Sequence, residues 1–484
     1  MTLNNPASSD PRRWAIFAVL LVGSFLPPLD FFIVNVALPS IQAELGTSSS
    51  AEQMVISSYA ALYAVTLITG GRLGDLYGRS RMFFFGITGF AAASLLCGIA
   101  WSPWALVAGR AMQGMTAAIM APQALASVHA MFPESEKSRA LSLYGAVLGL
   151  AAVIGQVLGG VLISLDLFGW GWRMVFLVNL PVALVVLLLG IPLLKNTRQR
   201  YAGKLDLVGM GLSILTLALL IVPLTEGREA GWPMWSWLSL SAAALSGWLF
   251  WRYEGKLARD GAIPLINPTV LRAPGLGRAL LIALSFYSIG SFFLLFSIYL
   301  QNAIHVNALH AGLVFLPFGM GYLLGPLASA FCRRFFGDHV TPIGMGMESM
   351  GLAGLAWLVT VTPTGVVPAF APLAAILFLV GFGQGLALPV LMRMITRRVE
   401  PAFSGMIAGI ASSTLQLSTA LSVAVIGGIF YTVLDVRIHP DAIADAFSVA
   451  VLCISCCLAT GVILGIRLIR LDNALMKERA TTST

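Results

Sequence analysis

The sequence predicts an all-α protein that crosses a membrane many times. Fourteen long apolar stretches divide the 484-residue chain, and each could cross about 30 Å of hydrocarbon as a helix. Hydrophobic residues make up 58% of the chain and charged residues only 10%, a balance that would drive a chain of this length to aggregate in water. Nearly all Lys and Arg fall in every second connection, as expected when connections alternate between two sides of a membrane.

The predicted spans follow one another along the whole chain. Each is one predominantly apolar run, which we assign to a single transmembrane helix. In order, the runs cover residues 14–36, 52–71, 82–101, 104–128, 139–163, 174–194, 205–224, 235–252, 279–301, 311–331, 340–361, 368–392, 403–434 and 446–468.

The basic residues predict which connections lie in the cytoplasm. One set of connections and the two tails hold almost all of them, whereas the other set holds only Arg173, Arg228 and Arg437. Because cytoplasmic loops of membrane proteins carry an excess of Lys and Arg, we expect the basic connections and both termini in the cytoplasm. An even number of crossings requires the same placement of the termini.

Two longer connections divide the predicted spans into groups of six, two and six. An internal repeat supports this division, because the pattern that begins at Gly71 recurs at Gly325 and the Gln113-Gly114 pair recurs as Gln384-Gly385. Many transporters are built from repeated halves that rock around a central site. We expect a cytoplasmic N-terminal tail (1–13), a six-helix bundle (14–194), a linker with two additional transmembrane helices (195–278), a second six-helix bundle (279–468) and a cytoplasmic C-terminal tail (469–484).

Several other functions fit the sequence poorly. The net charge of +8 is scattered over connections, without the basic face or aromatic platform that binds nucleic acid. The cysteines at 453, 456 and 457 have no His or carboxylate within a few residues, so we expect no metal site. Intramembrane His, Asp and Glu are too few for a catalytic centre, and no Gly-Lys-Ser/Thr loop suggests ATP as the energy source. We therefore expect neither an enzyme nor a bound cofactor.

The connection after the second span is short and charged. Residues 71–81 (GRLGDLYGRSR) contain glycines that permit close helix approach and positive φ, and Asp75 can form charge-assisted bonds that exist in only one arrangement of the two halves. A generic cytoplasmic turn is the alternative. The segment resembles the loop signature of the major facilitator superfamily, G-x-L-a-D-r-x-G-r-k, at Gly71, Leu73, Asp75, Gly78 and Arg79. The resemblance implies a loop that takes part in conformational change.

One aspartate stands inside the first span. Asp30 belongs to residues 29–39 (LDFFIVNVALP), and a carboxylate at membrane depth is costly and usually faces a cavity or a partner. The string is similar to the L-D-x-T-x-V-N-V-A-L-P signature of the fourteen-span drug:proton antiporters of that superfamily, with Phe32 in place of the threonine, which implies an altered substrate range. We expect Asp30 to bind the coupled proton; an aspartate that is merely hydrated near the outer end of the helix is the alternative.

The fourth span holds the one basic residue well inside a predicted helix. Arg110 would be expensive if unpaired, so we expect a carboxylate or a wet cavity nearby. The segment 109–114 (GRAMQG) resembles the R-x-x-Q-G motif of the superfamily, whose arginine is associated with proton coupling. Helix bracing through backbone carbonyls is the alternative role.

The fifth span is rich in glycine. Small residues four apart let helices approach closely, and residues 155–160 resemble the antiporter motif G-P-x-x-G-G through Gly155, Gly159 and Gly160. Gln156 replaces the proline of the motif, so we expect a less kinked helix and a weaker preference for antiport over symport. Plain helix packing explains the same glycines without transport.

We expect a central cavity between the halves, close to Asp30 and Arg110. Glu348 is a further candidate, because it lies in a methionine-rich stretch (GMGMESM, 344–350) that could adapt to varied ligands, although its nearness to the end of a span also allows snorkelling. The residues predicted to line the cavity are Phe31, Gln113, Glu348, Gln384 and Gln416.

The resemblance covers nearly the whole chain and implies proton-coupled export of small organic compounds by alternating access. It places the protein in the cytoplasmic (inner) membrane, where we expect it to work as a monomer surrounded by lipid and driven by the proton gradient. An importer or a lipid or metabolite facilitator of the same fold would show the same motifs. A non-transporting sensor would usually carry a soluble domain, and no tail or loop is long enough for one.

Overall fold

The computed structural model describes residues 12–194, 206–262, 264–363, 365–400, 404–436 and 441–482. These residues are almost entirely helical, and no strand occurs among them. The first part of the chain forms α1 (Arg13–Leu45), α2 (Ser49–Tyr77), α3 (Arg79–Gly98), α4 (Pro103–Met131), α5 (Glu134–Leu165), the short turns η1 (Leu167–Gly169) and η2 (Gly171–Arg173), α6 (Met174–Leu177) and α7 (Asn179–Leu193). The middle part forms α8 (Leu207–Glu229), α9 (Met234–Arg259) and α10 (Pro268–Leu271).

The remainder of the chain continues the same architecture. It forms α11 (Leu276–Phe286), η3 (Tyr287–Ile289), α12 (Gly290–Ile298), the π-helical turn η4 (Tyr299–Ala303), α13 (Ala308–Val314), α14 (Leu316–Phe336), η5 (Gly337–His339), α15 (Val340–Val361), α16 (Phe370–Thr396), α17 (Ser404–Val436) and α18 (Ala442–Thr482).

Every predicted span overlaps one or more of these helices, which confirms the all-α class. Within the described ranges, 11 helical stretches are long and apolar enough to cross a membrane. One of them, Ala308–Val361, is 54 residues long and contains α13, α14 and α15, so it exceeds the length of one crossing. The helices α4 and α9 cover two predicted spans but lie outside this set.

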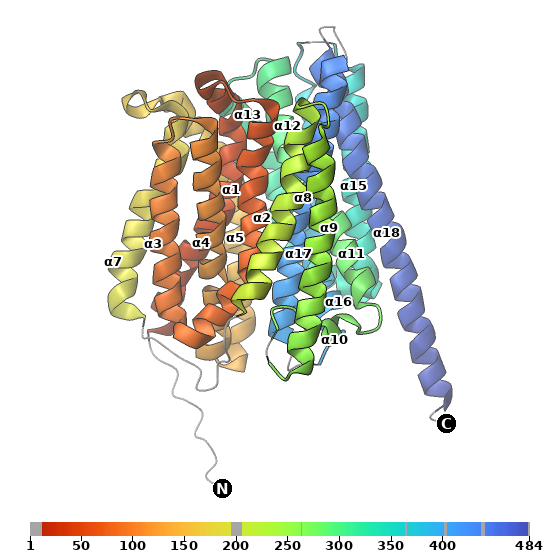
Figure 1. The fold of residues 1–484 in the computed structure, drawn as a ribbon. Coiled ribbons are helices and arrows are strands. Elements are labelled where there is room, and N and C mark those ends of the chain that lie inside the picture. The colour runs from red at the N-terminus through yellow and green to blue at the C-terminus, as the bar shows by residue number, and fades with distance from the viewer. Residues whose placement is uncertain are drawn as a thin grey trace.

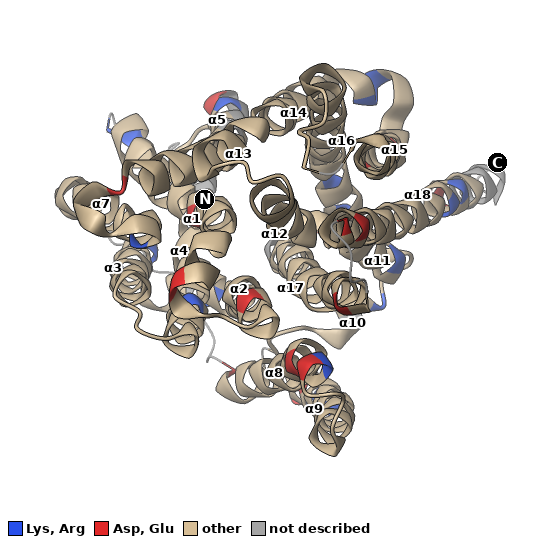
Figure 2. Cartoon of the chain, turned by 90° about the horizontal axis from the view of Figure 1, so that it is seen from above, with Lys and Arg blue, Asp and Glu red and all other residues tan. Residues whose placement is uncertain are grey.

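The helices run side by side between two ends of the molecule (Figure 1). We call the lower end in Figure 1, where α1 begins and α2 and α16 end, the basic end, and the upper end, where α2 begins and α17 ends, the distal end. Seen along the helices, α1, α3, α4 and α7 lie on one side and α11, α15, α16 and α18 on the other (Figure 2). The two sides meet where α5 packs on α13 and α14 and where α2 packs on α17. The helix α8 lies outside them, against α2 and α17, and α9 packs on α8.

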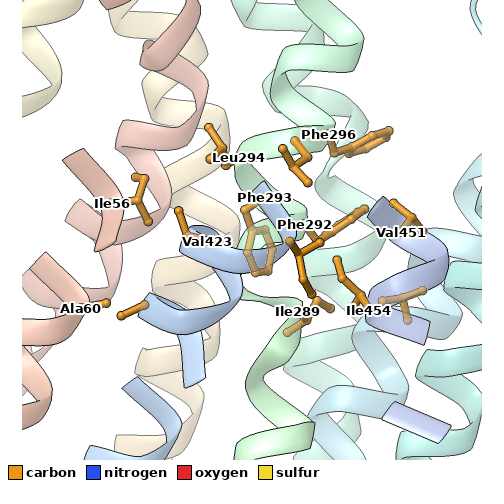
Figure 3. Packing of buried hydrophobic residues seen from close by; sticks show 14 of the residues in the cluster. Ile56, Ala60, Ile289, Phe292, Phe293, Leu294, Phe296, Val423, Val451 and Ile454 are labelled. Carbon is orange, nitrogen blue, oxygen red and sulfur yellow. The ribbon is translucent and has the colours of Figure 1, made fainter. Parts of the chain in front are cut away.

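Buried aromatic rings fill the second group of helices. Phe292 and Phe296 of α12 stack with ring centroids 5.2 Å apart, and Phe293 meets Phe318 of α14 edge to face at 5.2 Å. Figure 3 shows this cluster, with Ile56 of α2 near Val423 of α17 at its border. Since lipid is as apolar as these side chains, close packing rather than escape from water holds such helices together.

Glycines let two pairs of helices come into backbone contact. A Cβ atom on Gly70 of α2 would clash with the Ala118 carbonyl oxygen of α4. In the other half, a Cβ atom on Gly325 of α14 would lie 2.6 Å from the Leu386 nitrogen of α16. Of the residues in the predicted internal repeat, Gly114 of α4 and Gly385 of α16 lie in these two helix pairs, because a Cβ atom on Gly114 would clash with a carbonyl oxygen of α2 and one on Gly385 would lie 2.7 Å from a carbonyl oxygen of α14.

The charged segment after the second span is mostly helix rather than loop, which corrects the prediction. The helix α2 runs through Gly71 and the half-buried Leu73 to Tyr77, and Gly78, with φ of 102°, is the one residue between α2 and α3. Of the glycines in residues 71–81, only Gly78 has the positive φ that glycine permits. Arg79 donates to the Ala126 carbonyl of α4 at 2.8 Å, whereas the side chain of Asp75 lies outside the described residues.

Two carboxyl groups secure the basic end of the α8–α9 pair. Asp206 caps α8 by accepting from the Gly209 amide at 2.8 Å, and Glu254, at the polar end of α9, accepts from the Ile266 amide at 3.0 Å. Burial and a hydrogen bond with Asp206 raise the pKa of Glu254 from 4.5 to about 8. Asp206 and Glu254 therefore hold the connection between α9 and α10 against α8 and α9, and the raised pKa of Glu254 keeps its carboxyl group mostly protonated at neutral pH.

Candidate functional site

Asp30 of α1 and Arg110 of α4 form a fully buried ion pair. The Arg110 Nη1 donates to Asp30 Oδ2, and neither side chain is exposed. The Arg110 Nε donates to the Val55 carbonyl of α2 at 3.1 Å, and the Tyr59 ring lies 4.2 Å from the guanidinium carbon. The carboxylate expected near Arg110 is thus Asp30, and the aspartate is not merely hydrated at the end of its helix.

Three neutral side chains complete the shell around Asp30. Gln113 donates to Asp30 Oδ1 at 3.0 Å and accepts from Arg110 at 2.9 Å, while Asn179 of α7 donates to the same Oδ1 at 2.8 Å. Ser94 of α3 accepts from Gln113 at 2.8 Å. The Arg110 Nη2 has no hydrogen-bond partner among the described residues, so the guanidinium retains one donor that a rearrangement of the cluster could use.

The backbone around Asp30 is shaped by two prolines and by the glycines of α5. Pro27 and Pro28 lie inside α1, one turn before Asp30, where each removes a backbone donor from the helix. The Pro27 carbonyl accepts a hydrogen bond from the Tyr59 hydroxyl at 3.1 Å. The glycines of α5 also pack on α1. A Cβ atom on Gly155 would lie 2.9 Å from the Leu29 carbonyl oxygen, and one on Gly159 would lie 2.9 Å from the Ile33 carbonyl oxygen. The glycine motif therefore packs on the turn that carries Asp30.

The same motif also contacts the opposite half of the molecule. A Cβ atom on Gly160 would clash with the Ala308 carbonyl of α13, and one on Gly312 of α13 would clash with the Gln156 carbonyl. The helix α5 is continuous over 32 residues. On one side α5 contacts the turn of α1 that carries Asp30, and on another side it contacts α13 of the second half.

A cavity of about 140 Å³ lies beside this cluster, between the two groups of helices. Phe31, Gln384 and Gln416 line it, as predicted. Its walls are rich in Phe and Tyr, and its described lining carries no formal charge. The lining residues are Ser24, Pro27, Pro28, Phe31, Phe32, Tyr59, Tyr63, Ala121, Tyr144, Tyr287, Ile289, Gly290, Phe293, Tyr322, Gln384, Gln416 and Thr419.

Two residues predicted for the cavity lie elsewhere. Gln113 faces Asp30 and Arg110 inside the cluster, because its position on α4 points it toward α1 and α3. Glu348 is fully buried on α15, and neither of its carboxyl oxygens has a hydrogen-bond partner among the described residues. Neither residue is among those that line the cavity.

Three functional candidates were missed by the sequence analysis. Tyr59 carries no motif signal, although it both lines the cavity and stacks under Arg110. Asn179 and Ser94 contact Asp30 and Gln113; an asparagine within the apolar span 174–194 was the one signal that could have marked this position. Over the described ranges, no group of three His, Cys, Asp or Glu residues could hold a metal ion.

These features define a helical membrane protein in which two groups of helices enclose a small cavity, with a buried charge pair in one group. The chain belongs to the major facilitator superfamily, because residues 20–423 match the pattern of that family. The family resemblance predicted from the Asp30, Arg110 and 71–81 segments is thereby confirmed.

Several known proteins are similar to this chain. A probable actinorhodin transporter of Streptomyces coelicolor is 35% identical over 432 residues, 87% of this chain and 73% of that protein. The cephamycin export protein CmcT of Amycolatopsis lactamdurans is 34% identical over 414 residues, 83% of this chain and 82% of that protein. A solved structure from work on proton dependent oligopeptide transporters matches 96% of this chain and 100% of that chain with a TM-score of 0.71, at 14% identity, which supports the fold alone.

Proposed function

We propose that this chain exports small organic compounds across the cytoplasmic (inner) membrane in exchange for protons. It does so by alternating access through fourteen crossings, with the basic end and both termini in the cytoplasm. The names of the similar proteins, a transporter and an export protein, support efflux. The distribution of Lys and Arg supports the orientation. The proton gradient supplies the energy, without a cofactor, and the working unit is a monomer divided into two six-helix bundles and a two-helix linker.

The contact of Tyr59 with both the cavity and Arg110 carries this proposal. A compound in the cavity touches Tyr59 and Phe31. The Tyr59 ring stacks on the Arg110 guanidinium, and Phe31 follows Asp30 directly in α1. Arg110 stays protonated at all working pH values, so Asp30 is balanced either by the guanidinium or by a proton. A proton on Asp30 releases Arg110, and a ligand that displaces Tyr59 changes the same pairing. Substrate and proton therefore compete through one cluster.

The structure fits a state that is closed toward the outside. Among the described residues, hydrogen bonds between the two halves occur in the distal part, where Gln301 donates to the Val36 carbonyl at 3.0 Å and Tyr431 donates to Glu52. Phe32 and Phe293 meet edge to face at 4.9 Å on the distal wall of the cavity. In this orientation the cavity receives its ligand from the cytoplasm.

The cavity wall favours uncharged aromatic compounds. Its tyrosine and phenylalanine rings offer flat surfaces for stacking, and Gln384, Gln416 and Thr419 offer amide and hydroxyl groups. Among the described residues that line the cavity none is a carboxylate, which supports a preference for uncharged compounds.

Transport by inside-out vesicles with an acidic lumen tests the proposal. An exporter takes aromatic substrate into these vesicles and dissipates the gradient, and Asp30→Asn abolishes both effects while the protein still folds. Asp260→Asn, the same chemical change at an exposed turn, is the matched control and should keep full activity. Unchanged gradient-driven uptake by Asp30→Asn would exclude Asp30 from coupling, and substrate movement out of these vesicles would identify an importer.

A further inference from the structure

A second buried carboxyl group lies where the halves meet at the distal end. Glu52 of α2 is 1% exposed, and its Oε2 accepts a hydrogen bond from the Tyr431 hydroxyl of α17. Its Oε1 has no hydrogen-bond partner among the described residues. Glu52 and Tyr431 belong to opposite halves, 379 positions apart in the chain, so this contact breaks if α2 and α17 separate at the distal end.

The charged groups around this contact are already paired with each other. Arg228 of α8 lies with its guanidinium carbon 5.5 Å from the Tyr431 ring and forms an ion pair with Asp435 of α17 at 2.5 Å. Glu229 of α8 lies 3.6 Å from Arg228 and accepts from the Ser50 amide at 2.8 Å.

Two further polar residues lie close in the chain to the residues around this contact, on α8 and α2. Glu226 of α8 has one carboxyl oxygen without a hydrogen-bond partner among the described residues, and Gln53, next to Glu52 on α2, is neutral. None of the ion pairs found in the described part of the chain includes Glu52.

Physical chemistry then restricts the charge of Glu52. An ionised carboxylate without a cation is expensive to bury, whereas a neutral carboxyl with a hydrogen bond to a phenol is not. If the distal end opens, α2 and α17 separate and water can solvate the ionised form. Closing the distal end therefore requires that Glu52 take up a proton from the water outside, and opening allows it to return that proton.

We infer that Glu52 is a second proton-binding site, separate from the Asp30 cluster, and that protonation of Glu52 closes the distal gate formed by α2 and α17. This inference rests on the alternating access proposed above. The helix α8 takes part in the gate, because Arg228 contacts both α17, through Asp435, and α2, through Ser49.

The distance across the distal end at different pH values tests this inference. Spin labels at Trp101 and Val366, which are 78% and 50% exposed on opposite halves, report the open and closed populations in a variant without the native cysteines. In the parent, the ratio of open to closed molecules rises with pH by up to about tenfold per pH unit, the limit for one proton. In Glu52→Gln the closed population dominates at every pH. Glu44→Gln, at the same end, is the matched control and retains the pH response.

Tyr431→Phe provides a second test that does not depend on the folding of Glu52→Gln. Loss of one hydrogen bond to the closed state raises the ratio of open to closed molecules roughly fivefold. Closure then needs a higher proton concentration, so the midpoint of the pH response falls by about 0.7 pH unit. An unchanged midpoint overturns the inference.

The same measurement in Asp30→Asn separates this inference from the proposed export mechanism. A pH response that persists in Asp30→Asn and disappears in Glu52→Gln supports the distal site, whether or not Asp30 proves essential for transport. A response that disappears in Asp30→Asn but persists in Glu52→Gln overturns the distal site and leaves the proposed function standing. Absence of any pH response in the parent also overturns it.

Discussion

Loss of the Asp30 charge should destabilise the protein because Arg110 would remain buried without a counter-charge. Removing one partner of a buried ion pair costs about 3–5 kcal/mol. Arg110 would keep its bonds to the Val55 carbonyl and to Gln113 and its contact with the Tyr59 ring. We therefore expect a cost near the lower limit, about 3 kcal/mol, for Asp30→Asn.

A double-mutant cycle separates the pair energy from the effects of each single change. Arg110→Gln alone leaves Asp30 with two amide donors, Gln113 and Asn179, and should cost a similar amount. The double variant removes both charges, so its cost should be smaller than the sum of the single costs by about 2–3 kcal/mol. Unfolding of purified protein in detergent, followed by tryptophan fluorescence, measures each value.

Additive effects of the two substitutions would refute a stabilising contribution of the pair. Additivity means that each charge is stabilised by its other neighbours and that the pair itself contributes nothing. The pair Arg13–Glu136 at the basic end, with side chains 17% and 31% exposed, provides a comparison. Its coupling should be smaller, because solvent screens exposed ion pairs.

Three further predictions follow from close contacts and from one buried acid. Gly160→Ala inserts a methyl group against the α13 backbone, so it should raise the open fraction in the spin-label distance measurement, while Gly145→Ala, which has open space on the same helix, should leave it unchanged. Gly70→Ala should cost about 1–3 kcal/mol in unfolding free energy through its clash with α4, and Gly71→Ala, one residue along, should cost clearly less; equal costs would contradict the packing argument. The pKa of Glu254 is raised to about 8, so its contribution to stability falls as pH rises from about 4.5 to about 8; Glu254→Gln should melt at a higher temperature than the parent at pH 9, with a smaller gain at pH 5.

The sequence alone determined the class of protein and its most unusual residues. Apolar runs, the distribution of Lys and Arg and the charges of Asp30 and Arg110 inside those runs are local properties, and the membrane makes each of them conspicuous because it tolerates few polar groups. The glycines of α5 are also a local signal, because small residues at helical spacing indicate close helix packing.

Only the tertiary structure decided which side chains meet. Helix rotation turns Gln113 toward Asp30 but turns Gln384 toward the cavity, although the two residues occupy matching positions in the internal repeat. Tyr59 and Glu52 gave no sequence signal, because their importance comes from Arg110 and Tyr431, which belong to other helices. Contacts of this kind depend on how helices pack and rotate against each other, and residues distant in the chain set that packing together.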